Sequence, residues 1–513
     1  TMTTDAENNK RIAKNTVILY FRMALIMAIA LYTSRVVLNT LGEIDYGIYN
    51  VIGGVVLMFT FLNGAMAAST SRFITVELGK QDYGQLRKVF NTTLVNHLII
   101  ALIILLLAET IGLWFVQNKL VIPPERMSAA LTVYQFSIFT CLCTLLQTPF
   151  IATIIAHEKM NVYAWASVVD SVLKLAILYL LGIFPVDKLK LYALLMFYET
   201  GFMFSFYFIY IKKSFPYCAF LLPKDKKLYK TLFTYSGWSL FGDFSTLTQG
   251  QGLNILLNMF FGPTVNAARG ISYQVQGAIT QFSNNIITAV RPPIIKYYAR
   301  GEIQKMIQLV FNASKYSFLL VFALSLPIFL EMEYILNLWL KEVPEYTPSF
   351  TRIIILIVLI SAFRTPIITS MHATGKIKIP NVICGSILIS TVIFAYIALK
   401  MGYGPTSVFI VSLVITFLNM WVELYLIQRL VGYSIPLFIK KVFLISLLIG
   451  ILSAIVPIIV QNHMESSFFR LLVVGVSSVC SVLLCTYLIG IDHHLREKIN
   501  QRLLKLFLKF TKH

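Results

Sequence analysis

The chain has 513 residues, of which 57% are hydrophobic and 13% charged, with a formal net charge of +20 and a mean hydropathy of +0.76. This composition lies outside the range of soluble globular proteins and excludes a soluble catalytic domain, because apolar segments repeatedly reach the roughly 20 residues that cross a bilayer. The six cysteines form no CxxC pair, so we expect reduced packing residues and neither a disulfide framework nor a metal site.

We predict an all-α integral membrane protein with about fourteen transmembrane helices. In chain order, the predicted spans lie near 16–38, 46–68, 89–116, 130–155, 162–184, 189–211, 229–257, 265–290, 305–330, 350–371, 380–399, 405–428, 436–460 and 468–490. The seventh and eighth spans are the most polar, so a hydropathy window alone would score them poorly.

Basic residues concentrate in alternate loops, as the positive-inside rule requires of cytoplasmic segments. One such loop contains Lys212, Lys213, Lys224, Lys226, Lys227 and Lys230, and the loop after the ninth span is acidic instead, with Glu331, Glu333, Glu342 and Glu345. The N-terminus is therefore predicted to be cytoplasmic, and an even number of spans places the C-terminus there too. The positive charge indicates anionic membrane lipids as partners and gives no support for nucleic acid.

The segment 493–513 is predicted to be a cytoplasmic, basic, amphipathic helix on the membrane surface. A partly disordered basic tail is the alternative.

An internal repeat divides most of the chain into two related halves. Gly42 matches Gly262 at an offset of 220, the VFN sequence at 89–91 recurs at 310–312, and the TP sequence at 148–149 recurs at 365–366. An offset of six spans preserves orientation, so we predict parallel repeats related by a pseudo-two-fold axis. The predicted lobes are 1–215 and 216–430, with a separate helix pair at 431–492. Two such lobes suggest a transporter; a static scaffold is the alternative.

Several charges fall inside predicted spans, where each costs roughly 2.5–3.5 kcal/mol on insertion scales. Such residues usually face a partner or a water-filled cavity. The basic ones, which are candidate ligands for the pyrophosphate or sugar of a substrate, are Arg22, Lys174, Arg269 and Arg364. The acidic ones are Asp170, Glu199, Asp243 and Glu423. Asp170 and Lys174 are four residues apart on one helix face, so they are equally well explained as a pair that neutralises itself.

The eighth span carries a long polar stripe at three- and four-residue spacing. Its members are Arg269, Ser272, Tyr273, Gln276, Thr280, Ser283 and Asn284, and the seventh span offers Gln249 and Asn254. Lipid does not solvate such a stripe, so it either lines a cavity or bonds to neighbouring helices. We favour a cavity that binds an anion carrying sugars, because guanidinium groups bind phosphate bidentately and amides and tyrosines bond sugar hydroxyls.

The stretches RIAKNTVILYFRMALIMAIALYTSRVVLNTLGEIDYGIYNVIGGVV (11–56) and YSGWSLFGDFSTLTQGQGLNILLNMFFGPTVNAARGISYQVQGAI (235–279) carry a resemblance to a known family. The chain resembles the oligosaccharide-lipid (O-antigen) flippases of the polysaccharide transporter family, in the multidrug/oligosaccharidyl-lipid/polysaccharide exporter superfamily.

The resemblance implies a V-shaped, two-lobe fold in a bacterial inner membrane. It further implies that the chain flips undecaprenyl-pyrophosphate-linked oligosaccharide to the outer leaflet, with polysaccharide polymerase or assembly proteins as partners. By the same resemblance, Arg22 and Arg269 are the first candidates for the pyrophosphate, and 431–492 for a groove that holds the lipid tail.

No cofactor is expected, and the chain has no GxxxxGK[ST] loop for ATP. Coupling to Na+ or H+ would supply the energy, and Asp243, Asn419 and Glu423 are the candidate cation site, although structural pairing explains them as well. A multidrug exporter on the same fold is the alternative function. A membrane-embedded glycosyltransferase or polymerase is disfavoured because the longest outer loop, 331–349, has only about 20 residues, as expected of a non-enzyme. An assembly partner without transport activity remains a further alternative.

Overall fold

The structure is a computed structural model that describes residues 5–58, 70, 73–74, 77–78, 82–157, 159–216, 226–374, 376, 378–491 and 496–497. It covers the backbone but not the side chains at 5–24, 226–240 and several single helical positions, one of which is Asp243. The predicted amphipathic tail lies outside the described residues apart from 496–497.

Every regular element within these ranges is a helix. The first half of the chain forms α1 (Asp5–Met58), α3 (Tyr83–Leu107), α4 (Leu113–Asn118), α5 (Met127–Ala156), α6 (Met160–Leu180), α7 (Lys188–Ser214) and α8 (Lys226–Phe261). The second half forms α9 (Pro263–Ala299), α10 (Ile303–Leu330), α11 (Met332–Trp339), α12 (Thr347–Ala373), α13 (Lys378–Lys400), α14 (Thr406–Val431), α15 (Ile435–Phe438), α16 (Leu444–His463) and α17 (Phe468–Cys485). Short π-helical segments join α3 to α4 and α15 to α16, and another follows α17.

Within the described ranges, eleven helical segments are long and apolar enough to cross a bilayer. One of them, Leu25–Met58, contains the first two predicted spans, which Gly42 separates with a φ of 81° and a ψ of 170°. The polar seventh and eighth spans fail the hydropathy criterion, as expected, yet form α8 and α9, of 36 and 37 residues. Counting these helices and both parts of α1 gives the fourteen spans that the sequence predicts, and the chain is a multi-pass membrane protein.

The predicted repeat has a counterpart in the backbone. Gly42 and Gly262, matched at an offset of 220, both adopt left-handed φ values, 81° and 79°. Each of them interrupts the helical path between two consecutive spans. The matched prolines Pro149 and Pro366 both lie inside a helix, in α5 and α12. Only glycine adopts positive φ without steric cost, so a glycine at both matched positions permits the same φ in the two halves.

The described contacts group the chain into two compact units. Unit 1 comprises Thr1–Gln274, Trp339–Thr347 and Asn381–Val411, and unit 2 comprises Val275–Leu338, Pro348–Pro380 and Ser412–His513. The boundary runs through α9 and α14 and does not coincide with the predicted lobe boundary at 215/216. The lobe limits therefore stay a prediction.

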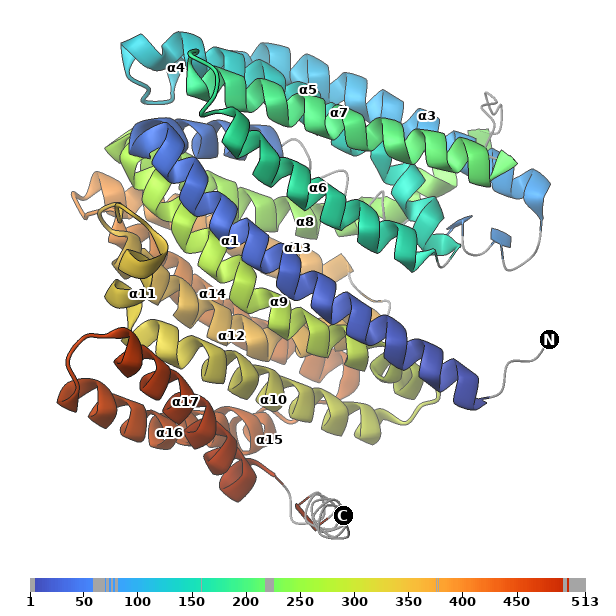
Figure 1. The fold of residues 1–513 in the computed structure, drawn as a ribbon. Coiled ribbons are helices and arrows are strands. Elements are labelled where there is room, and N and C mark those ends of the chain that lie inside the picture. Colours follow the sequence, from blue (N-terminus) through green and yellow to red (C-terminus); the bar gives the residue numbers. More distant parts are fainter. Residues whose placement is uncertain are drawn as a thin grey trace, which may run out of the picture. The chain divides into compact units, whose positions relative to one another are not determined.

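Unit 1 is built around α1, α5 and α7. Helices α5 and α7 lie side by side (Figure 1), and the part of α1 after Gly42 packs against α5 through a fully buried cluster that includes Ile48, Ile52, Val133 and Tyr134. The Tyr134 hydroxyl donates to the carbonyl of Ala108 at 2.7 Å. These contacts fix the side of α1 that faces α5 and α7, and this side lines the cavities described below.

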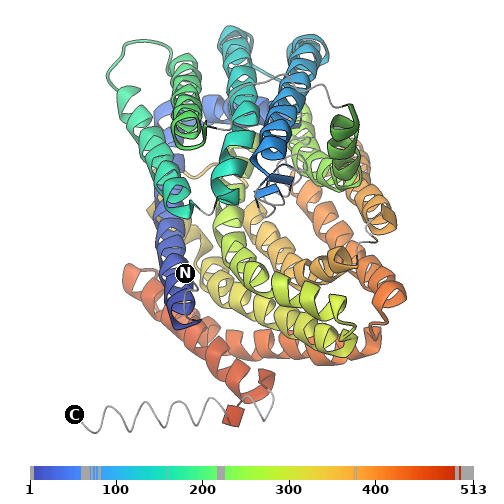
Figure 2. The same cartoon turned by 90° about the vertical axis from the view of Figure 1, so that its right-hand side faces the viewer.

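In unit 2, α16 and α17 lie side by side and both contact α10 (Figure 2). Phe318 of α10 stacks on Phe363 of α12 with ring centroids 4.3 Å apart. A buried ion pair joins Arg470, at the start of α17, to Glu331 at 2.7 Å. The terminal helix pair is therefore tied to α10 by apolar packing and by a charge pair.

Candidate functional site

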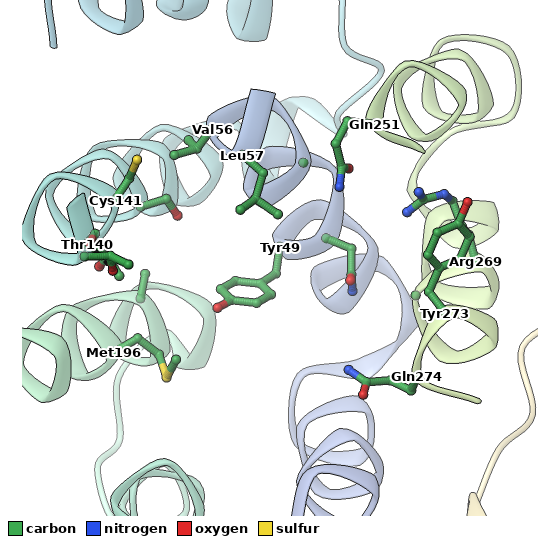
Figure 3. A pocket seen from close by; sticks show the side chains of 17 residues that line it. Tyr49, Val56, Leu57, Thr140, Cys141, Met196, Gln251, Arg269, Tyr273 and Gln274 are labelled. Carbon is green, nitrogen blue, oxygen red and sulfur yellow. Dashed lines mark hydrogen bonds between the residues drawn. The ribbon is translucent and has the colours of Figure 1, made fainter. Parts of the chain in front are cut away.

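A cavity of about 450 Å³ lies in unit 1 and is lined by residues of α1, α5, α7, α8 and α9 (Figure 3). Its lining residues are Tyr49, Asn50, Gly53, Gly54, Val56, Leu57, Ser137, Thr140, Cys141, Thr144, Ala193, Met196, Gln251, Arg269, Gly270, Tyr273 and Gln274. No aspartate or glutamate occurs among these residues. Among the described side chains, the cavity therefore combines amide and hydroxyl groups with one cationic group, that of Arg269.

Arg269 is the cation of this cavity and is only 4% exposed. Its Nη2 donates to the carbonyl oxygen of Gly250 at 2.7 Å, and its guanidinium carbon lies 3.8 Å from the centroid of the Tyr273 ring. Its Nε is buried and has no hydrogen-bond partner among the residues that the structure describes. No acid forms an ion pair with Arg269 in the described part of the chain. A buried guanidinium without a counter-ion is costly, so the site favours an incoming anion.

Close packing places Arg269 at the cavity. Gly270 lies so near Asn50 that a Cβ built on it would meet the Asn50 side chain at 2.8–3.0 Å. Asn50 and Gly270 are separated by the repeat offset of 220, so equivalent positions of the two halves face each other. The absence of a side chain at Gly270 lets α9 approach α1 and brings Arg269 and Tyr273 to the cavity lined by Tyr49.

A second cavity of about 310 Å³ adjoins the first within unit 1 and shares Tyr49, Asn50 and Gln274 with it. Its other lining residues are Ile26, Ile29, Ala30, Thr33, Ser34, Val37, Tyr46, Asp170, Ser171, Lys174 and Tyr192. Lys174 Nζ donates to both Asp170 carboxylate oxygens at 2.8 Å. Lys174 thus borders a cavity, as predicted for a substrate ligand, while also forming the neutralising pair that the sequence offers as the alternative.

The other predicted ligands of the seventh and eighth spans have different surroundings. Tyr273 lines the first cavity, and Gln276 follows on α9 with a buried Oε1 that has no partner. Asn254 is 1% exposed, and its Nδ2 donates to the Asn50 carbonyl at 3.2 Å. Gln249 donates to Thr391 Oγ1 at 3.3 Å. Asn254 and Gln249 therefore join helices of unit 1, and their predicted role in binding substrate stays a prediction.

Unit 2 holds the charged candidates Arg364 and Glu423. Arg364 on α12 forms a bidentate ion pair with Glu423 on α14, with Nε to Oε2 at 2.9 Å and Nη2 to Oε1 at 2.6 Å. Asn419 Nδ2 lies 3.4 Å from Glu423 Oε1. The structure thus brings together Asn419 and Glu423 of the predicted cation site, with Arg364 as their basic neighbour. The side chains of Arg22 and Asp243 lie outside the described residues.

Residues of α5 and α1 line the first cavity without having been identified from the sequence. Ser137, Thr140, Cys141 and Thr144 lie at positions i, i+3, i+4 and i+7 of α5 and form one stripe. This spacing indicates one polar face of a helix and could have been identified from the sequence. The strong hydropathy of the segment makes that face less conspicuous. Tyr49 has no such signal, because an isolated tyrosine in a transmembrane segment is normally a packing residue.

An apolar cavity of about 300 Å³ lies in unit 2, between α10, α12 and α16. It is lined by Phe318, Phe322, Ser325, Leu326, Phe329, Leu330, Ile355, Leu356, Leu359, Leu447, Gly450, Ile451, Ala454 and Ile458. The segment 431–492, for which a lipid-tail groove is predicted, thus contributes α16 to this cavity. Its lining suits a hydrocarbon chain.

No protein-family profile matches this chain, and no curated protein matches it in sequence. Solved structures do match. Lipid II flippase MurJ in an inward closed conformation has a TM-score of 0.69 at 12% identity, over 93% of this chain and 98% of that one. An inward-facing multidrug resistance transporter of the MATE family, in the MOP superfamily, has a TM-score of 0.66 at 16% identity, over 81% and 97%.

A third similar structure is an MOP superfamily transporter from Pyrococcus furiosus, in which reverse polarity of the binding pocket suggests a different function. Its TM-score is 0.60 at 16% identity, over 82% of this chain and 97% of that one. At these identities the likeness shows the fold alone. The chain has the two-lobe, all-helical fold of these transporters.

Proposed function

We propose that this chain is a flippase that moves undecaprenyl-pyrophosphate-linked oligosaccharide from the inner to the outer leaflet of a bacterial inner membrane. The observation that carries the proposal is Arg269, a buried guanidinium whose Nε has no partner among the described residues, in a cavity whose described lining contains no acid. A pyrophosphate oxygen beside this guanidinium would neutralise a charge that the described residues leave unpaired.

Within unit 1, the lining of the cavity around Arg269 suits the pyrophosphate of such a lipid. Within unit 2, the lining of the apolar cavity suits an isoprenoid chain. Binding the polar head inside the protein while the tail stays in an apolar environment avoids the cost of moving phosphate and sugar hydroxyls through hydrocarbon. Alternating access would then release the head on the other side of the membrane.

Energy for the cycle would come from a cation gradient. Asn419 and Glu423 of unit 2 remain a proposed cation site, and the contribution of Asp243 stays a prediction from the sequence. Arg364 competes directly with a cation for Glu423, because it occupies both carboxylate oxygens. A cation could bind there only when this ion pair opens, which would couple ion binding to a change in the packing of α12 against α14.

The proposal is tested by measuring lipid-linked oligosaccharides by mass spectrometry in cells that lack this chain. Wild-type protein should reverse the accumulation of a completed undecaprenyl-pyrophosphate oligosaccharide, and Arg269→Ala should not. Arg429→Ala is the matched control, because Arg429 also stacks on a tyrosine, with its guanidinium 4.7 Å from the Tyr425 ring, but it is exposed at the end of α14. Full complementation by Arg269→Ala would refute the anion site.

A multidrug exporter is the second candidate, and the likeness to MATE transporters is the observation that favours it. Against it, a cationic drug would meet the positive charge of Arg269 in a cavity whose described lining offers no acid. Efflux of cationic dyes that is insensitive to Arg269→Ala, together with no accumulation of lipid-linked sugar, would establish the exporter.

A further inference from the structure

The two adjoining cavities of unit 1 differ in their charge. The first contains Arg269 and no acid, whereas the second contains Lys174 and Asp170, which neutralise each other. Glu199 on α7 is 5% exposed and interacts with Asp170, so a second carboxyl group lies next to the second cavity. A phosphate would be attracted to Arg269 in the first cavity, whereas the Lys174–Asp170 pair in the second cavity is neutral overall and offers no net charge to attract it. The second cavity therefore suits an uncharged ligand.

Polar atoms in the second cavity have spare capacity for hydrogen bonds. The side chains of Lys174 and Asp170 are 37% and 31% exposed. Their pairing uses two of three N–H donors and two of about four acceptor sites. Thr33 Oγ1 is buried at the lining of the same cavity and has no partner. This set offers donors and acceptors next to one another, as a hydroxyl group requires.

Tyrosine rings enclose the same cavity. Tyr46, Tyr49 and Tyr192 all contribute to its lining, and the rings of Tyr49 and Tyr192 lie 4.9 Å apart, tilted by 57°. Such rings combine an apolar face with a polar hydroxyl. A sugar ring has the matching character, with apolar C–H faces and a polar rim.

One ligand can reach both cavities, because Tyr49, Asn50 and Gln274 line each of them. An anionic group at Arg269 would place the next part of the molecule at this shared boundary. The cation at Arg269 is thus followed by a cavity with neutral groups that bind hydroxyls. In a lipid-linked sugar, the anionic pyrophosphate is likewise followed by the uncharged sugar.

We infer that the second cavity is a subsite for an uncharged sugar ring, formed by Thr33, Asp170 and Lys174 beside Tyr49. The inference rests on the proposed function, because it assumes that the anion at Arg269 is the pyrophosphate of a glycolipid. Asp170 and Lys174 bind sugar hydroxyls, Tyr49 supports the ring, and neither charge contacts phosphate.

Two variants test the subsite without leaving a charge unpaired. Thr33→Val removes a hydroxyl that has no partner in the protein and conserves the shape of the side chain. Asp170→Asn with Lys174→Gln removes both charges together and conserves polarity. Thr132→Val on α5 is the control, because the Thr132 hydroxyl bonds only to the Ser128 carbonyl, at 2.9 Å, outside both cavities.

The measurement is the dissociation constant of purified protein in lipid nanodiscs for undecaprenyl pyrophosphate and for the same lipid carrying one hexose. Thr33→Val should weaken binding of the hexose-bearing lipid by about threefold to tenfold, and the double variant by about tenfold, with the sugar-free lipid unchanged. Arg269→Ala should weaken both lipids. Melting temperatures of all variants confirm that folding is intact.

The outcomes separate the subsite from the proposed function. If Arg269→Ala weakens both lipids and the subsite variants change neither, the subsite is refuted and the flippase proposal stands. If only the subsite variants weaken the hexose-bearing lipid, the sugar site stands and the pyrophosphate role of Arg269 is refuted. Equal weakening of both lipids by the subsite variants would also overturn the inference, because it would show that Asp170 and Lys174 serve the phosphate.

Discussion

The ion pair between Arg364 and Glu423 predicts a large and specific effect on stability. Arg364 is 11% and Glu423 2% exposed, and two short hydrogen bonds join them. Arg364→Met leaves the carboxylate buried with only the Asn419 amide at 3.4 Å. Removing one partner of a buried pair costs about 3–5 kcal/mol, whereas removing both together is nearly neutral or stabilising. Arg364→Met/Glu423→Leu should therefore recover most of the loss.

The assay is the free energy of unfolding in mixed micelles titrated with a denaturing detergent, for both single variants and the double variant. Arg352→Met is the matched control, because Arg352 pairs with Glu333 at 2.8 Å with side-chain exposures of 36% and 58%, and an exposed pair contributes at most about 1 kcal/mol. A double variant as unstable as Arg364→Met would refute the reasoning. Transport by the double variant is the second readout: retained transport makes the pair structural, and lost transport in a stable protein supports the cation site.

Three further predictions concern the bend, one loop and the apolar cavity. Gly262→Ala should destabilise the protein by about 1–2 kcal/mol, because φ at this position is 79°. Gly277→Ala is the control and should be neutral or stabilising, because Gly277 lies inside α9 with open space around it. The same micelle titration measures both variants. Burial alone would raise the pKa of Asp187, but hydrogen bonds from Arg126 and two backbone amides lower it below its ordinary value. The ionised Asp187 therefore stabilises the folded state fully above the unfolded pKa of about 3.9, and this stabilisation is lost as the pH falls through the folded pKa. Arg126→Gln should make the free energy of unfolding fall less steeply with decreasing pH in the acid range. An unchanged acid dependence would contradict this reasoning. Ala454→Phe should fill the apolar cavity of unit 2 and slow flipping of the tailed lipid while leaving pyrophosphate binding at Arg269 intact; unaltered flipping would exclude that cavity as the site for the tail.

Sequence by itself determined the helices and the bends between them. Length and hydropathy set most spans, because only a long apolar helix satisfies its backbone inside a bilayer. Hydropathy alone does not identify the polar helices α8 and α9. The repeat supports them as spans, because it matches Gly262, which lies between them, with Gly42, which lies between the first two spans. Both glycines have a positive φ, which the missing side chain permits locally.

The partner of each polar side chain was decided only by tertiary structure. Helical spacing put Arg269, Tyr273 and Asn254 on polar stripes, yet the first two line a cavity and Asn254 bonds to Asn50 across helices. Arg364 shows the same limit, because its partner Glu423 is 59 residues away on another helix. Spacing fixes the face of a helix on which a residue lies. Whether that face meets a cavity, an acid or another backbone depends on how the helices pack, which no single segment encodes.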